Sequence, residues 1–77
     1  DLTLAIYPNP SSGTIKVQLG AAKYKQIQVM NAYGQIIQSL PLSSNTKEIT
    51  LENLPRGINL LQLYTDSSVV VRKVVVN

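Results

Sequence analysis

Few side chains in this sequence could carry out acid–base or nucleophilic chemistry. The chain contains no histidine and no cysteine, which excludes a Ser–His pair, a thiolate nucleophile and a disulfide bond. Its acidic residues are Asp1, Glu48, Glu52 and Asp66. Only Glu48 and Glu52 are close in sequence, at the two ends of a short apolar segment where solvated charges are expected. Because a catalytic pair of carboxylates must lie within about 5–10 Å, this pattern does not indicate an enzyme.

The hydroxyl groups and the possible metal ligands are also poorly placed for chemistry. Most serines lie in turn-like segments, where a hydroxyl commonly bonds to nearby backbone; these are Ser11, Ser12, Ser43, Ser44, Ser67 and Ser68. A lysine could act as the base for one of them, but no motif indicates it. Oxygen and nitrogen ligands do not cluster along the sequence. We therefore predict no catalytic, metal or cofactor-binding residues.

Two groups of basic residues could bind a partner. Lys23-Tyr24-Lys25 alternates charge with an aromatic ring, as single-strand nucleic-acid binders do. One such triplet in a chain of net charge +3 does not suffice, and we predict no nucleic-acid partner. Arg72 and Lys73 interrupt a run of valines. They either discourage aggregation between strands or contact a receptor, and the residues alone favour neither.

Length and composition predict one small domain over residues 1–77. The core must be aliphatic, because the chain has no Phe and no Trp. A domain of this size buries only about 60% of its unfolded surface, so its stability is marginal. The sequence shows no apolar run of the roughly 18–20 residues that span a bilayer and no leader of the secretory type. Since it opens on Asp1 rather than Met, we expect it to be part of a longer polypeptide.

Polar and apolar residues alternate in short segments, which is the pattern of half-buried antiparallel strands. Ile15, Val17 and Leu19 mark the clearest example. The predicted strands are residues 2–7, 14–19, 23–30, 35–40, 48–51 and the two apolar runs on either side of 65–68. Seven strands with turn residues between them predict an all-β fold, a seven-stranded antiparallel immunoglobulin-like β-sandwich.

The last two runs are the most hydrophobic part of the chain. They are rich in β-branched residues, which favour strands over helices. We expect both strands to be buried on both faces and to form a central hairpin, with the earlier strands laid around it. A free, valine-rich end could also complete the sheet of a neighbour, so exchange of this strand between two copies, giving a homodimer, is open.

Two turns have recognisable chemistry. Asn31 can bond to its own backbone and Gly34 can adopt φ > 0, as a type I turn with a following bulge requires in a hairpin. Residues 52–57 form a corner rather than a helix, because Pro55 and Gly57 are too close together for a helix. We predict that Gly57 adopts a conformation that other residues resist.

Four short motifs occur in order along the chain. They are Tyr7-Pro8-Asn9-Pro10 before a small-residue turn, Asn31-x-x-Gly34, Leu54-x-x-Gly57 before an apolar run, and Lys73-Val74-Val75-Val76 before the final Asn77. This set, which covers essentially the whole chain, resembles the C-terminal sorting domain of proteins exported by the type IX secretion system of Bacteroidetes-type bacteria. One position departs from the family pattern. Asn59 stands where members usually carry an aromatic residue. This difference concerns the details of recognition by a partner more than the fold.

The resemblance implies an export address at the end of a larger cargo rather than an enzyme. The outer-membrane translocon would recognise the folded domain. A sortase-like cysteine transpeptidase would then remove it and join the cargo to anionic lipopolysaccharide, which the domain meets only indirectly. The implied route leads through the periplasm to the outer-membrane surface or the extracellular space. The candidate recognition residues are Arg72, Lys73, Val74, Val75, Val76 and Asn77.

Two other interpretations stay open. Some family members keep their domain, which then serves as a retained surface module of the secretion or attachment machinery. From a different class, a generic immunoglobulin-like accessory domain of an extracellular enzyme would have the same fold. Such a module has no reason to lie at the extreme C-terminus of its parent, so its position in the full-length protein would distinguish the two.

Overall fold

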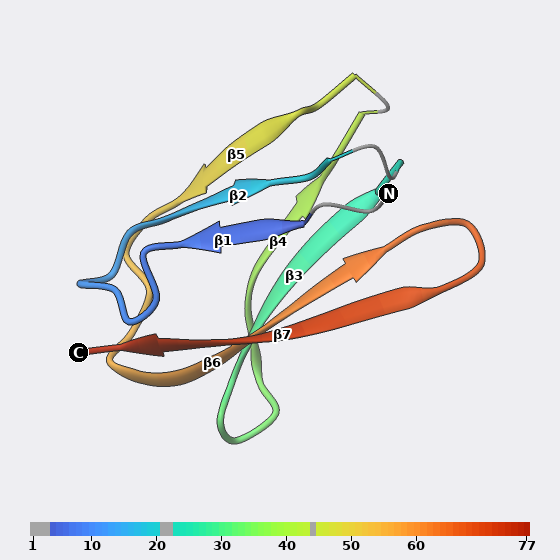
Figure 1. The fold of residues 1–77 in the computed structure, drawn as a ribbon. Helices are drawn as coiled ribbons and strands as arrows, with labels where there is room; N and C mark the ends of the chain where they lie inside the picture. Colours follow the sequence, from blue (N-terminus) through green and yellow to red (C-terminus); the bar gives the residue numbers. More distant parts are fainter. Residues whose placement is uncertain (1–3, 21–22, 44) are drawn as a thin grey trace.

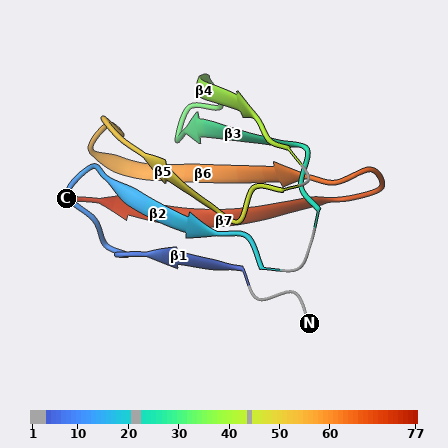
Figure 2. The same cartoon turned by 90° about the horizontal axis from the view of Figure 1, so that it is seen from above.

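The computed structural model describes residues 4–20, 23–43 and 45–77. Their strands are β1 (Ala5–Tyr7), β2 (Ile15–Gln18), β3 (Gln26–Asn31), β4 (Ile36–Pro41), β5 (Glu48–Leu51), β6 (Gly57–Tyr64) and β7 (Val69–Val76). They form a three-stranded sheet in the order β1-β2-β5 and a four-stranded sheet in the order β4-β3-β6-β7 (Figures 1 and 2). Every strand pair within a sheet is antiparallel. The predicted all-β antiparallel sandwich of seven strands is confirmed.

The three-stranded sheet follows the alternation read from the sequence. In β2, Ile15 and Val17 are fully buried and Lys16 and Gln18 are exposed. β2 is the middle strand and pairs with β1 on one side and β5 on the other. Because successive side chains of a strand point to opposite faces, one face of this sheet closes the core and the other is solvated.

The terminal hairpin is neither central nor buried on both faces, contrary to the expectation from its valines. β6 lies between β3 and β7, but β7 is an edge strand. Val74 and Val76 are buried, whereas Val69 and Val71 on the other face are 48% and 46% exposed. Valine favours extended backbone whether or not its side chain is buried. The valine run therefore predicted a strand correctly and its place in the sheet wrongly.

The core lies between the two sheets and is almost entirely aliphatic. Its buried residues are Ile15, Val17, Leu19, Tyr24, Ile27, Val29, Leu51, Leu54, Leu61, Leu63, Val74 and Val76. They come from both sheets, from the connection between β2 and β3 and from the corner before β6, so neither sheet is buried without the other. Tyr24, only 3% exposed, is the one aromatic residue among them.

The hairpin between β3 and β4 has the turn that its sequence predicts. The Asn31 side-chain Oδ1 accepts the N–H groups of Tyr33 and Gln35 at 2.9 and 3.0 Å. The N–H of Gly34 donates to the Asn31 carbonyl at 3.1 Å. Gly34 has φ of +86°, in the region that favours glycine. The Asn31 side chain therefore stabilises the turn at Asn31–Gly34 by hydrogen bonds, and Gly34 allows the positive φ that the turn requires.

The corner before β6 depends on two residues with positive φ. Asn53 has φ of 60°, which asparagine tolerates better than most residues, and Gly57 has φ of 110°. Between them Leu54 turns into the core, and its N–H donates to the Gly13 carbonyl at 3.0 Å. The corner thus joins the two sheets, and the conformation of Gly57 agrees with the prediction from the sequence.

Replacing Gly57 with valine should lower the free energy of unfolding by more than about 1 kcal/mol, since β-branched residues strongly disfavour positive φ. A Cβ atom at this position would have no neighbouring atom within 4 Å, so the expected loss arises from the backbone conformation rather than from a clash at Cβ. Thermal unfolding of G57V would measure it, with Ile58→Val, at a neighbouring exposed position, as the matched control. An unchanged melting temperature in G57V would contradict the backbone explanation.

Candidate functional site

The Tyr-Pro-Asn-Pro turn binds the edge of the last strand through the side chain of Asn9. Its Nδ2 donates to the carbonyl of Lys73 at 3.2 Å. Its Oδ1 accepts the N–H of Val75 at 3.0 Å. The side-chain amide has the same donor and acceptor groups as a peptide unit. Asn9 therefore takes the place of a neighbouring strand at this point of β7.

Ser11 continues this pairing with its backbone. Its N–H donates to the Val75 carbonyl at 2.8 Å, and its carbonyl accepts the N–H of Asn77 at 2.9 Å. These bonds form a parallel bridge between Ser11 and Val76. Ser11 is buried, and its hydroxyl oxygen accepts the N–H of Gly13 at 3.3 Å. The turn therefore pairs three backbone groups of β7, and the N–H of Asn77 after it, that would otherwise be free at the sheet edge.

The contribution of these bonds is large for so small a protein. A typical hydrogen bond adds about 0.5–1.5 kcal/mol to stability, and four of them join the turn to residues 73–77. A core of this size supplies only about 3–5 kcal/mol. The first turn and the last strand are thus expected to stabilise each other substantially.

Three of the four sequence motifs are joined at one end of the sandwich. Gly13, after the Tyr-Pro-Asn-Pro turn, bonds to Leu54, and Gly57 is the register partner of Val76. The C-terminus and the connection between β1 and β2 lie together at this end in Figure 1. The fourth motif begins at Asn31, which is the register partner of Asn59 near the start of β6. Its turn therefore leaves the four-stranded sheet at the same end.

Arg72 and Lys73 are both exposed, but on opposite faces of β7. Arg72 is the register partner of the buried Leu61 and lies on the core-facing side, whereas Lys73 is the partner of Leu60 on the outer side. The Arg72 guanidinium donates to the carbonyl of Val71 at 3.1 Å. A partner that lay on the outer face of the sheet would meet Lys73 and not Arg72.

The other candidate recognition residues differ in accessibility. Val74 and Val76 are buried in the core, Val75 is partly buried on the outer face, and Asn77 is exposed. The buried pair therefore serves the packing of the folded domain. Any partner that binds the folded terminal strand has Lys73, Val75 and Asn77 available to it, together with Arg72 at the edge.

Asn59 is a buried polar residue that reasoning from the sequence did not identify as such. It is 1% exposed, and its Nδ2 donates to the carbonyl of Pro55 at 2.9 Å. Its Oδ1 has no partner among the described residues. A buried polar atom without a partner lowers stability. The alternation of Leu61 and Leu63 along β6 was the signal that would have placed Asn59 on the inner face.

Tyr7 and the charged residues near it lie on the surface. The Tyr7 hydroxyl donates to the Glu48 carboxylate at 3.2 Å. Partial desolvation, followed by this hydrogen bond and the negative charge of Glu48, raises the pKa of the Tyr7 hydroxyl above its usual value. Glu52 is exposed, as is Glu48. The two carboxylates thus have the solvated character expected from the sequence.

The Lys23-Tyr24-Lys25 segment lacks the exposed ring that base stacking requires. Tyr24 is buried in the core. The Lys25 ammonium forms an ion pair with Asp66 at the surface. These contacts give the triplet a structural role at the start of β3.

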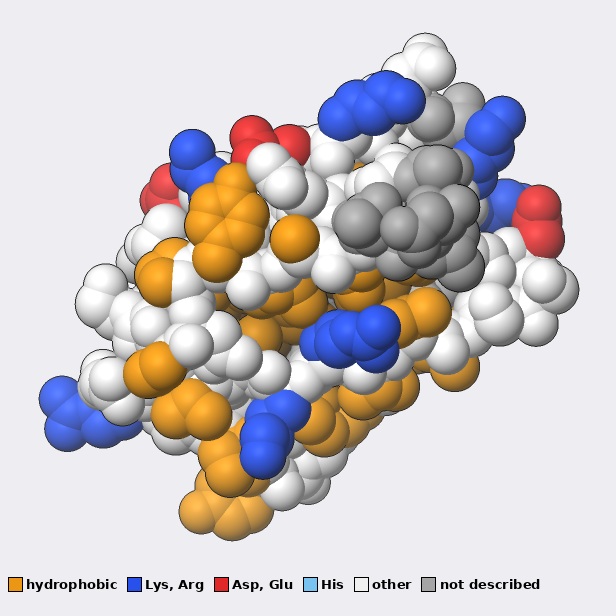
Figure 3. Space-filling view, in the orientation of Figure 1, with side chains coloured by type: hydrophobic (Ala, Val, Ile, Leu, Met, Phe, Trp, Pro, Cys, Tyr) orange, Lys and Arg blue, Asp and Glu red, His pale blue; other side chains and the backbone are white. Residues whose placement is uncertain are grey.

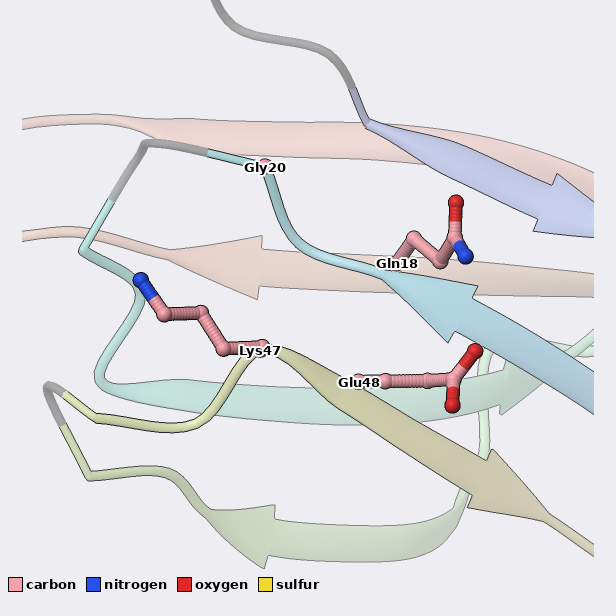
Figure 4. A pocket seen from close by; sticks show the side chains of 4 residues that line it. All are labelled: Gln18, Gly20, Lys47 and Glu48. Carbon is pink, nitrogen blue, oxygen red and sulfur yellow. The ribbon is translucent and has the colours of Figure 1, made fainter.

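Two surface depressions lie among the described residues, and the second is lined in part by the ion-paired Lys25 and Asp66. One, of about 390 Å³, is lined by Gln18, Gly20, Lys47 and Glu48. Figure 4 shows the Lys47 ammonium directed away from the Glu48 carboxylate. The part of the chain that the structure describes contains no group of three or more side chains able to hold a metal ion. Nor does any helix in that part have the length and apolar character to cross a membrane.

Comparison with known families identifies the chain. A family model described as the secretion system C-terminal sorting domain matches residues 5–77. The chain belongs to this family. It is the sorting domain of a type IX secretion cargo, a non-enzymatic signal for export across the outer membrane that interacts with the secretion machinery. No curated protein matches it in sequence.

Replacing Asn9 of the sorting domain with alanine should destabilise it by about 1–2 kcal/mol, because two hydrogen bonds to β7 are lost. Chemical denaturation would measure the change, and the amide of Val75 should exchange faster with solvent. Asn9→Asp is the informative comparison, since it keeps an acceptor for Val75 but places a carboxylate against the Lys73 carbonyl. Wild-type stability in both variants would show that Asn9 does not secure the strand.

Proposed function

We propose that residues 1–77 are a single C-terminal sorting domain that the outer-membrane translocon recognises in its folded form. A sortase-like cysteine transpeptidase then cuts the chain ahead of the domain and joins the cargo to anionic lipopolysaccharide. The domain itself passes through the periplasm and carries the cargo to the outer-membrane surface or the extracellular space. It contributes the surface that the machinery holds and none of the chemistry.

The observation that carries this proposal is the junction of the motifs at one end of the fold. The turn that contains Asn9 and Ser11 bonds to β7, and the corner at Leu54 bonds to Gly13. Motifs that are distant in sequence therefore support the end of one strand, β7. Such an arrangement suits a signal that is read only when the domain has folded.

A fusion tests the proposal directly. Residues 1–77, preceded by some native sequence, would be joined to an unrelated periplasmic protein in a host with the type IX system. We expect the fusion at the cell surface, where protease accessibility and surface labelling would detect it. The same cargo without the domain should stay in the periplasm.

The fusion also separates the rival interpretations. A folded domain that leaves its cargo in the periplasm would favour a generic accessory module. A fusion that reaches the surface with the domain still attached would favour a retained surface module of the secretion or attachment machinery. Mass spectrometry of the surface protein distinguishes a cleaved domain from a retained one.

Replacing Lys73 with alanine should reduce export of the fusion without unfolding the domain. The Lys73 side chain is exposed, and Asn9 bonds to its backbone carbonyl, which the substitution keeps. The expected loss of stability is therefore below about 0.5 kcal/mol. Lys16→Ala, at an exposed position of the other sheet, is the matched control. Normal export of a folded K73A fusion would leave Lys73 without a role in recognition.

A homodimer formed by exchange of the terminal strand also stays a prediction. β7 is part of its own sheet in the described chain, paired with β6 over its whole length. Exchange would replace that pairing with an identical one in a second copy. Light scattering over a range of protein concentrations would detect it.

A further inference from the structure

The outer edge of β7 has hydrogen-bonded backbone groups near its last residues and unpaired backbone groups before them. Asn9 and Ser11 bond to the outward N–H and carbonyl of Val75. In an antiparallel strand, alternate residues direct both groups to the same side. The N–H and carbonyl groups of Val71, and the N–H of Lys73, therefore also point away from β6. In the described chain the only hydrogen bond that these groups form is the one between the Val71 carbonyl and Arg72.

The other edge strands of the sandwich are protected in ways that β7 is not. β1 and β5 are only three and four residues long. β4 has a register shift opposite Val29 and Met30 and ends in Pro41. Short strands, bulges and prolines all discourage the addition of a further strand. β7 has eight residues and pairs with β6 without any shift, so residues 69–73 are the accessible edge of the described fold.

The side chains around this edge are apolar and positively charged. Val69 and Val71 are about half exposed on the outer face, beside Lys73, and Arg72 lies on the inner face. Figure 3 shows hydrophobic side chains on both sides of β7, with Lys and Arg side chains lying among them. Within the described residues, neither Arg72 nor Lys73 forms an ion pair with a carboxylate. A strand added here would therefore meet two cations that lack acidic partners.

We propose that the β7 edge at residues 69–73 binds an extended, carboxylate-bearing segment of the secretion machinery as an additional strand. The backbone of the added strand forms hydrogen bonds with the N–H and the carbonyl of Val71. The Arg72 guanidinium then leaves the Val71 carbonyl and pairs with a carboxylate of the added strand, while Lys73 pairs with another on the outer face. This inference rests on the proposed function. It identifies the backbone of β7 as the surface that the secretion machinery binds.

A second copy of the chain fits this edge less well. Two β7 edges paired antiparallel about Val71 would bring two copies of Arg72 and two of Lys73 to one junction. No carboxylate from residues 69–73 would balance them. Like charges placed close together destabilise a strand pair, so charge complementarity favours an acidic partner.

The sharpest test is Val71→Pro in the fusion described above. Proline removes the outward N–H that the added strand needs but no bond to β6, and prolines are tolerated at such edge positions. Val71→Thr, which keeps the N–H, is the matched control. We expect both isolated domains to melt within about 4 °C of the wild type. The V71P fusion should fall to the surface level of the cargo without the domain, and the V71T fusion should remain at the cell surface.

Several results would overturn the proposal. Wild-type export of a folded V71P fusion would show that the edge is not used. If V71P does not fold, the charge-reversed variant R72E/K73E serves instead, and its normal export would exclude an acidic partner. A wild-type domain that is dimeric by light scattering and becomes monomeric in V71P would identify a second copy as the occupant. Failure of the wild-type fusion itself would count against the proposed function.

The premise can be measured on the isolated domain. Hydrogen exchange should be fast at the Val71 amide and slow at the amides of Val70 and Arg72, which bond to β6. Protection of Val71 in the monomer would show that the edge is already closed. Because V71P keeps the side chains of Arg72 and Lys73, its loss of export would be distinct from a loss caused by K73A.

Discussion

The fold depends on the side-chain amide of one residue, which joins the beginning of the described chain to its last strand. Asn9 bonds to Lys73 and Val75, which lie 64 and 66 residues further along the sequence. The last strand would otherwise present a continuous unpaired edge, which is a hazard for any β-protein. Asn9 and Ser11 close the half nearest the C-terminus, where Val74 and Val76 complete the core. The motif at the start of the chain is therefore a structural support for the motif at its end.

Local chemistry predicted much of this structure. The alternation in residues 14–19 identified the buried face of β2, and Asn31 with Gly34 identified the hairpin turn. What could not be predicted was the position of each strand in its sheet. Long-range pairing sets that position, and the pattern of a single strand does not encode it. The bonds of Asn9 escaped prediction for the same reason, since an asparagine in a turn is expected to bond to its own neighbours.

The two cations of the terminal strand have separate surroundings, although they are adjacent in sequence. Because a strand alternates its faces, Arg72 lies over the rim of the core and Lys73 on the outer sheet. Arg72 already occupies the Val71 carbonyl, so it restrains the edge in the free domain. The sequence left two alternative roles for Arg72 and Lys73, namely protection from unwanted strand pairing and contact with a partner. In this geometry the same residues can serve both roles.

The parallel bridge between Ser11 and Val76 also has a consequence for biosynthesis. A ribosome makes the Tyr-Pro-Asn-Pro turn before it makes residues 73–77, and contacts between distant residues slow folding. The turn must wait until residues 73–77 have emerged before its bonds can form. A nascent chain that stops short of these residues contains Asn9 and Ser11 but lacks the backbone groups to which they bond. The folded state of this domain therefore requires that residues 73–77 have been translated.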